Sequence, residues 1–289
     1  MKHRGFERIL LATDGSDQAD AATHVAAALA EPSSASVRVV HCWNLEVHHR
    51  HGVWDVEMRS EAEELIAEAV RRLRALDVEA DGRLMRSDNE HVGHAIAEAA
   101  REFNADLVVV GSRGLSDWRS LLQHSVSHEV LRTVDCPVLI VREDAASLLH
   151  EPSRVLVAVA GGDDLAPAIR AAIAAASAPG SRVLVTHVVQ AMFGAQGFAY
   201  VESDEEAAAT IEAAVSMLRD AGIRAEGKLA DPGPVARTLA DIALQWQADM
   251  IVIGSSRMSD VASLTFGSVT HDLLRSSRRP VLVAERLHK

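Results

Sequence analysis

Two segments of this 289-residue chain carry glycines and hydroxyls with a spacing that suits the binding of an anion. In the first segment, Gly111 ends an apolar run of strand type, Gly114 follows three residues later, and Ser125 stands at the start of a run with helical spacing. Glycine lets the backbone approach a ligand closely, and the free N–H groups at a helix start attract phosphate. The first segment is therefore predicted to bind a phosphate group.

The second segment repeats the first further along the chain. Gly254 stands in the place of Gly111, and Ser268 stands in the place of Ser125 at the same offset. Repetition over such a distance indicates that the chain consists of two copies of one unit. A second anion site is predicted at Gly254, Arg257, Gly267 and Ser268. The guanidinium of Arg257 can bind an anion there with two donors, or fill the phosphate position with its own charge.

Runs with strand and helix patterns alternate through both copies. In the first copy, strand-like runs at 8–13, 37–43, 78–85, 107–110 and 136–141 are separated by helix-like runs at 19–30, 60–76, 90–103 and from 126 onward. The second copy repeats this order, and Ser60 and Ser203, each followed three residues later by Glu, predict capping boxes. The alternation predicts parallel sheets with right-handed crossovers. We expect an α/β fold with two tandem doubly wound, Rossmann-like domains at residues 1–144 and 153–289, each with helices on both faces of its sheet.

The polarity of the strands predicts their order in each sheet. The runs at 8–13 and 107–110 are the most apolar, whereas the run at 78–85 alternates as an edge strand with one wet face does. Each domain is therefore expected to have a five-stranded parallel sheet of order 3-2-1-4-5. Ligands of doubly wound sheets bind at the carboxyl ends of the strands at the switch point, here between the first and fourth strands. Asp14 and Gly111 are both predicted to lie there.

Composition excludes several classes of function. The formal net charge of −12 leaves no excess of Lys and Arg for a nucleic-acid surface. Only Cys42 and Cys136 are cysteines, which excludes a disulfide framework, and no apolar run approaches the roughly 18 residues that a membrane span requires. The N-terminus runs directly into a strand, so we expect a cytoplasmic protein without a targeting segment. The 14 histidines bring no Cys or carboxylate at closed-site spacing, so no metal is expected beyond Mg²⁺ carried by a nucleotide.

Motifs in both copies resemble the universal stress protein family in its tandem, two-domain form. These motifs are Thr13-Asp14-Gly15-Ser16, Val40-His41-Cys42, Thr186-His187-Val188, Cys136-Pro137-Val138-Leu139 and Arg279-Pro280-Val281-Leu282, and the resemblance covers almost the whole chain. Nucleotide-binding members of the family carry an Asp after the first strand and the pattern Gly-x2-Gly-x9-Gly-Ser/Thr after the fourth. The resemblance implies a stress-response or signalling module that binds ATP in its first domain. The implied nucleotide-binding residues are Ala12, Asp14, Cys42, Val110, Gly111, Gly114, Ser125 and Val126.

Neither copy has the complete family pattern. In the first copy His124 replaces the last glycine; in the second, Arg257 replaces the second glycine and Ala160 stands at the position of Asp14. The first copy is the better candidate for nucleotide binding, because it departs from the family pattern at one position and the second copy departs at two. The alternative is an interaction or scaffold protein of the same fold that binds no nucleotide. The sequence has no Gly-x-Ser-x-Gly elbow, Walker Gly-x4-Gly-Lys or Gly-x-Gly-x-x-Gly loop, so no enzyme is expected, although slow incidental ATP hydrolysis stays open.

The fifth strands of the predicted order are edge strands, although both of their faces are apolar. They lie at 138–141 and 281–284. Such edges would aggregate if they were left in water, so they must be covered. We expect the two strands to pair within the chain, which would then imitate the symmetric dimer that single-domain relatives form. A homodimer of whole chains would use another surface.

Overall fold

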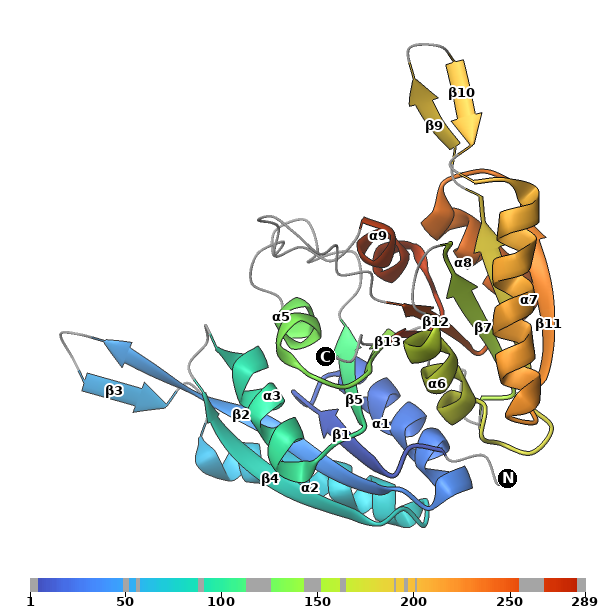
Figure 1. The fold of residues 1–289 in the computed structure, drawn as a ribbon. Helices are drawn as coiled ribbons and strands as arrows, with labels where there is room; N and C mark the ends of the chain where they lie inside the picture. Colours follow the sequence, from blue (N-terminus) through green and yellow to red (C-terminus); the bar gives the residue numbers. More distant parts are fainter. Residues whose placement is uncertain are drawn as a thin grey trace. The chain divides into compact units, whose positions relative to one another are not determined.

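The chain folds into two compact units in the computed structural model. The first unit comprises residues 6–151, and the second comprises residues 152–289 together with residues 1–5. In Figure 1 the first unit runs from blue to green and the second from yellow-green to red. The structure describes residues 5–48, 52–55, 58–87, 91–112, 126–142, 152–161, 165–189, 191–194, 197–200, 202–254 and 268–284.

The first unit has the predicted parallel strand order with one antiparallel addition. Its described strands are β1 (Arg8–Ala12), β2 (Ser36–His48), β3 (Gly52–Asp55), β4 (Ala80–Ser87), β5 (Leu107–Ser112) and β6 (Val138–Arg142). The parallel strands follow the order β4-β2-β1-β5-β6, which confirms the order 3-2-1-4-5. The hairpin partner β3, which the sequence pattern did not predict, pairs antiparallel with the end of β2.

The helices of the first unit cover both faces of its sheet. They are α1 (Asp17–Ala30), a short 3-10 helix (Glu31–Ser33), α2 (Arg59–Ala75), α3 (Val92–Phe103) and α5 (Val126–Thr133). α1 packs with α2, and α3 packs with α5. The chain crosses from β1 outward to β4 and then returns to β5 and β6, so right-handed crossovers place these two pairs of helices on opposite faces.

The second unit repeats this arrangement. Its strands are β7 (Arg154–Val159), β8 (Arg182–Val188), β9 (Ala191–Gly194), β10 (Gly197–Tyr200), β11 (Arg224–Ala230), β12 (Met250–Gly254) and β13 (Val281–Ala284). Its helices are α6 (Ala166–Ala175), α7 (Asp204–Asp220), α8 (Val235–Gln245) and α9 (Ser268–Ser276). The parallel order β11-β8-β7-β12-β13 is again 3-2-1-4-5, and β9 and β10 form a separate antiparallel hairpin that the sequence pattern did not predict.

The two predicted capping boxes differ in outcome. At α7 the prediction is confirmed, because the Ser203 hydroxyl accepts the N–H of Glu206 and the Glu206 carboxylate accepts the N–H of Ser203 at 2.9 Å. At α2 the prediction was wrong by two residues, because the helix starts before Ser60 and Met58 is its N-cap. The helix start is capped by the carboxylate of Glu61, which accepts the Met58 N–H at 3.2 Å, and not by that of Glu63. A carboxylate that reaches back to the N-cap therefore needs no hydroxyl partner at that position.

A buried core and a matching carboxylate clamp hold the first and fourth strands of each unit side by side. All residues from Ile9 to Leu11 and from Leu107 to Val109 are fully shielded from solvent. The Asp106 carboxylate accepts the N–H groups of Glu7 and Arg8, at 2.7 and 2.9 Å. In the second unit Asp249 accepts the N–H groups of Ser153 and Arg154 in the same way. These clamps join the two central strands at their amino ends, opposite the carboxyl ends at which the sequence places the ligand.

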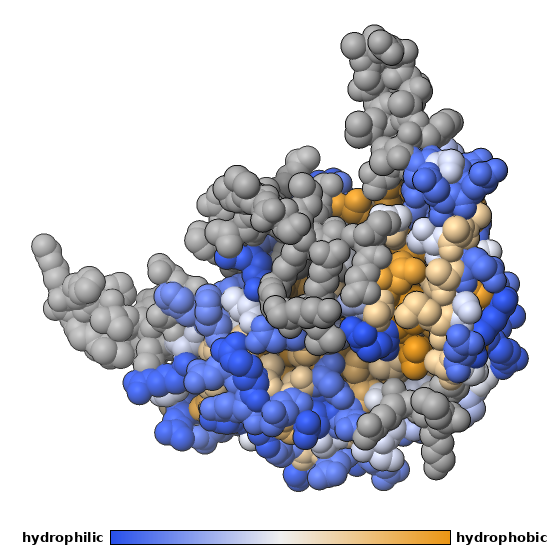
Figure 2. Space-filling model, viewed as in Figure 1, coloured by the Kyte–Doolittle hydropathy of each residue, from blue (hydrophilic) through white to orange (hydrophobic). Residues whose placement is uncertain are grey.

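The outer surface of the described helices is mostly polar on the face shown in Figure 2, with an apolar area over α6. α6 carries no acidic residue in its first turn, and its Ile173 and Ala174 are only partly buried. α1, which occupies the same place in the first unit, has Asp17 and Asp20 in its first turn. The first turns of these two helices therefore differ in charge.

Candidate functional site

The loop after β1 presents a carboxylate at the carboxyl end of the first unit's central strand. Asp14 is exposed, and its Oδ1 accepts hydrogen bonds from the N–H and the hydroxyl of Ser16, the N-cap of α1. Gly15 has a φ of 73°, a left-handed conformation that suits glycine, and its N–H donates to the Thr13 hydroxyl. The turn thus holds the Asp14 side chain at the start of a helix and at the edge of the sheet.

Gly111 lies at the end of β5, beside the same loop. Ala12 and Val110 are paired in register on β1 and β5, so the predicted residues of these two strands do meet at one edge. A Cβ atom on Gly111 would lie 2.8 Å from the backbone carbonyl of Gln18 and 3.0 Å from the backbone nitrogen of Ala19. The close approach expected from the glycine therefore exists, and the backbone of the first turn of α1 makes it.

The end of β2 contributes a histidine and a thiol. The ring Nδ1 of the buried His41 lies 2.7 Å from the carbonyl oxygen of Thr13, so this nitrogen carries the proton and donates. The Cys42 thiol, next along the strand, donates weakly to the carbonyl of Val92 at 3.9 Å. Burial raises the pKa of the Cys42 thiol to about 12, and the negative charge of Glu129 adds to this. The Cys42 thiol is therefore uncharged at physiological pH, and it is not a nucleophile.

The remaining predicted residues of the first unit follow β5. Val126 is the first residue of α5 and is 37% exposed, which places it at the helix start as expected. The hydroxyl of Ser127 lies 3.5 Å from the carbonyl of Gly111, a long contact between the helix start and the strand end. Gly114 and Ser125 lie outside the residues that the structure describes.

The second unit has a different carboxylate at the end of its first strand. Ala160 occupies the position of Asp14, yet the Glu202 side chain reaches this strand end and contacts Nε2 of His187. The other ring nitrogen of His187 donates to the carbonyl of Val159 at 2.9 Å, and the side chain of His187 is only 2% exposed. A Cβ atom on Gly161 would lie 2.5 Å from the Glu202 carboxylate. The sequence pattern did not indicate a role for Glu202, because a single Glu before a helix cap belongs to no motif with a recognisable spacing.

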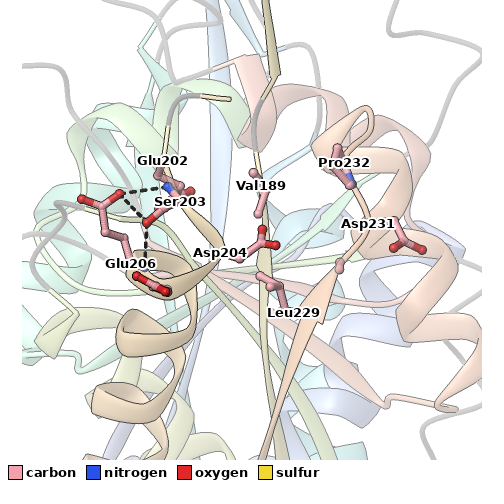
Figure 3. A pocket seen from close by; sticks show the side chains of 10 residues that line it. Val189, Glu202, Ser203, Asp204, Glu206, Leu229, Asp231 and Pro232 are labelled. Carbon is pink, nitrogen blue, oxygen red and sulfur yellow. Dashed lines mark hydrogen bonds between the residues drawn. The ribbon is translucent and has the colours of Figure 1, made fainter. Parts of the chain in front are cut away.

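An open pocket of about 940 Å³ lies beside Glu202, at the ends of β8 and β11 and at the start of α7. Its apolar lining is Val189, Leu229, Ala230 and Pro232, and its polar lining is Glu202, Ser203, Asp204, Glu205, Glu206 and Asp231. Figure 3 shows Ser203 and Glu206 joined by their capping bonds on one side, and Asp204 beside Val189 and Leu229. A pocket with this many carboxylates repels phosphate.

The predicted second anion site is described only in part. Gly254 ends β12 and Ser268 is the first residue of α9, whereas Arg257 and Gly267 lie outside the described residues. Among the described residues, the atom nearest to a Cβ on Gly254 would be the Ala168 side chain, at 4.0 Å. Within this part of the chain, close packing requires glycine at position 111 and not at position 254.

Two further expectations concern metals and membranes. Within the described ranges, no group of three or more His, Cys, Asp or Glu side chains is placed to hold a metal ion. Over the same residues, none of the helices has both the length and the apolar character that crossing a membrane requires.

The comparison with protein families decides where this fold belongs. A family model described as the universal stress protein family matches residues 5–142 and again residues 152–285. The chain belongs to the universal stress protein family. The tandem, two-domain form inferred from the motifs is thereby confirmed.

Full-length relatives share the tandem arrangement of this universal stress protein. A universal stress protein of Mycobacterium tuberculosis (strain H37Rv) is 26% identical over 298 residues, which cover 99% of each chain. The crystal structure of a universal stress protein from Archaeoglobus fulgidus DSM 4304 matches with a TM-score of 0.75 and 22% identity, over 98% of this chain and 97% of that one. A further universal stress protein from Archaeoglobus fulgidus, solved in complex with dAMP, is 28% identical and covers 46% of this chain and 98% of its own, with a TM-score of 0.36.

Proposed function

We propose that this protein binds an adenine nucleotide in its first unit and acts as a nucleotide-responsive stress or signalling module. One observation carries the proposal. The exposed Asp14 carboxylate is held at the carboxyl end of β1, beside the end of β5, which is the switch point of the first unit's sheet. Ligands of doubly wound sheets bind at this place.

The chemistry of the surrounding residues favours a nucleotide. A carboxylate at the end of β1 can accept hydrogen bonds from ribose hydroxyls, as acidic residues do in related sheets. Ala12, Val110 and the neutral Cys42 offer uncharged surface nearby. The N–H groups at the start of α5 can donate hydrogen bonds to phosphate oxygens, together with the predicted Gly114 and Ser125. ATP is the proposed ligand, with Mg²⁺ only as its counterion.

The second unit is a poorer candidate for the same ligand. It lacks the Asp14 carboxylate, because Ala160 stands there, and the Glu202 side chain contacts its His187 instead. Its open pocket lies at the ends of β8 and β11 and is lined by five carboxylates, which oppose a triphosphate at that place. We therefore propose a single nucleotide per chain, and we assign no catalytic step to the site.

Calorimetric titration of the whole chain with ATP, ADP and dAMP tests the proposal. We expect one ATP per chain and loss of binding in the double variant Asp14→Ala, Ser125→Ala. The matched control is Ser268→Ala, the equivalent hydroxyl of the second unit, which should leave affinity and stoichiometry unchanged. Undiminished affinity in the double variant would move the site elsewhere in the chain.

The alternative, a scaffold protein that binds no nucleotide, rests on His124, which stands where the family pattern has glycine. If the imidazole blocks the phosphates, His124→Gly should gain ATP affinity. Failure of both the parent and the His124→Gly variant to bind any of the three nucleotides would favour the scaffold.

A further inference from the structure

A carboxylate on α5 joins this helix to the start of α3. Glu129 lies one turn after Val126, the first residue of α5. One carboxylate oxygen accepts the N–H of Gly93 at 2.9 Å, and the other lies 2.5 Å from Nδ1 of His94. Gly93 is in the first turn of α3, where N–H groups have no partner within the helix and the helix dipole favours a negative charge. The Glu129 side chain therefore satisfies the start of a neighbouring helix.

A second contact between α5 and the start of α3 lies one turn further along α5. The Thr133 hydroxyl donates to the carbonyl of Glu129 at 2.8 Å and lies 3.3 Å from the carbonyl of Gly93. A Cβ atom on Gly93 would lie 2.5 Å from Cγ of Glu129 and 2.7 Å from its carboxyl carbon. Only glycine therefore leaves room for the carboxylate. Glu129, Thr133 and Gly93 form one bridge between the two helices, here called the α5–α3 bridge.

The second unit has different residues at all three positions of the bridge. Ala236, Asp272 and Ser276 stand where the first unit has Gly93, Glu129 and Thr133, at the offset that relates Gly254 to Gly111. The Asp272 carboxylate lies 3.5 Å from Nδ1 of His271 and 3.7 Å from the guanidinium of Arg275, both on its own helix.

The hydroxyl of Ser276 likewise bonds within α9, to the carbonyl of Asp272. Asp272 is one methylene shorter than Glu129, and Ala236 carries the Cβ atom that Gly93 lacks. Of the hydrogen bonds and ion pairs described for Asp272 and Ser276, none reaches α8. The bridge thus belongs to the unit for which we propose nucleotide binding.

We propose that Glu129 is a positioning residue of the nucleotide site, which holds the phosphate-binding start of α5 in place against α3. This inference rests on the proposed function. The described part of α5 has eight residues, Val126–Thr133. A helix this short is marginal by itself, so contacts with its neighbours set its position. Its start can contribute to phosphate binding only while that position is kept.

The bridge also limits the effect of the carboxylate's own charge. The N–H of Gly93 and the imidazole of His94 both face the Glu129 carboxylate. These partners offset part of the negative charge that Glu129 places one turn from the proposed phosphate position and that also raises the pKa of the Cys42 thiol. A positioning role therefore fits both its geometry and its charge.

The test is a comparison of ATP with adenosine on the whole chain. We expect Glu129→Ala to weaken ATP binding about tenfold, because a displaced helix start no longer meets the phosphates. Adenosine, which has no phosphate, should bind as it does to the parent. Glu129→Gln, which keeps the length and an acceptor for Gly93, should restore most of the ATP affinity. Asp272→Ala in the second unit is the matched control and should change neither ligand.

Three outcomes would overturn the inference. If a folded Glu129→Ala variant keeps the ATP affinity of the parent, Glu129 has no positioning role. The proposed function would still stand, because the parent binds ATP. An equal loss for ATP and adenosine would show general loosening of the unit instead of positioning. Absence of ATP binding by the parent would overturn the proposed function and this inference with it. If Glu129→Ala does not fold, Thr133→Val removes the second contact only, and it must then lower the ATP affinity relative to adenosine.

Discussion

The two units share one strand order and differ at the carboxyl ends of their first and fourth strands. In the first unit, the exposed Asp14 and Gly111 lie at this edge, and the backbone of α1 lies against the glycine. In the second unit, Ala160 replaces the aspartate and the Glu202 carboxylate sits on His187 at the strand end. The shared sheet determines where a ligand can bind, and the residues that follow the strands determine the charge of the binding site.

The length of the first loop accounts for part of this difference. In the first unit only residues 13–16 separate β1 from α1, whereas residues 160–165 separate β7 from α6. The shorter loop brings the first turn of α1 against β5, where only glycine fits. In the second unit, the described atom nearest to a Cβ on Gly254 is the Ala168 side chain, at 4.0 Å. Among the described residues, the same glycine of the family pattern therefore packs against backbone in the first unit only.

The largest predicted effect should be the same in both units. Leu139 on β6 and Leu282 on β13 are completely buried, so Leu139→Glu or Leu282→Glu places a carboxylate in an apolar core. An uncompensated buried charge costs about 3–5 kcal/mol, and we expect the altered unit to unfold at a clearly lower temperature. Scanning calorimetry of the whole chain measures this. An unchanged thermal midpoint in either variant would contradict the burial of that strand.

Separate production of the two units extends this prediction to their free edges. Within its own unit β6 pairs with β5, and β13 pairs with β12. The pairing of β6 with β13 inferred from the apolar edges stays a prediction. If it is correct, each separated unit should self-associate through its fifth strand, and sedimentation analysis should find dimers. Two stable monomers would rule out the internal dimer.

A smaller effect should distinguish the units. In Gly111→Ala the new Cβ atom meets the backbone of Gln18 and Ala19, which cannot rotate away, so we expect a loss of roughly 1–3 kcal/mol. In Gly254→Ala the nearest described atom is 4.0 Å from the new Cβ, and the change in stability should stay within about 0.5 kcal/mol. Denaturant unfolding of the whole chain gives both values. Equal losses in the two variants would show that α1 and α6 approach their sheets alike.

The sequence predicted the fold well because burial leaves a regular pattern. The polarity of the run at 78–85 identified an edge strand, and the apolar runs at 8–13 and 107–110 identified the two central strands, as the order β4-β2-β1-β5-β6 confirms. Every parallel strand of both units overlaps a run predicted from the sequence. The polarity of a strand reports how many of its faces are buried, and this distinguishes the central strands of a sheet from its edge strands.

The candidate site was predicted less completely, because its contacts join segments that are distant in the sequence. The pattern showed that backbone approaches Gly111, but not that the backbone belongs to α1. Glu202 reaches His187 from a loop, and Glu129 reaches Gly93 from another helix. Side-chain reach of this kind has no period along the chain. The hairpins at β3 and β9–β10 are local pairings, and the sequence pattern did not predict them either.

The smallest predicted effect concerns the helix caps, which the two units build differently. Ser203→Ala removes the hydroxyl that accepts the Glu206 N–H, and such a loss costs about 1 kcal/mol. Ser60→Ala in the first unit should change stability by less than about 0.5 kcal/mol, because Ser60 is an exposed residue inside α2 and Met58 is the N-cap. Unfolding of the two variants at neutral pH measures the contrast. A larger loss for Ser60→Ala would mean that the helix starts where the sequence pattern placed it.

Acid should remove the advantage of the second unit's cap. The backbone N–H of Ser203, and then its hydroxyl, lower the pKa of the Glu206 carboxyl below its ordinary value. A group whose pKa is lower in the folded state stabilises the fold above the ordinary carboxyl pKa, and this contribution is lost as the pH falls through the folded-state pKa. The difference in stability between the parent and Glu206→Gln should therefore be constant near neutral pH and shrink below about pH 4.5. Glu205→Gln, one residue earlier in the same exposed turn, is the control for charge alone. A difference for Glu206→Gln that persists in acid would show that the carboxylate contributes through something other than its ionised hydrogen bonds.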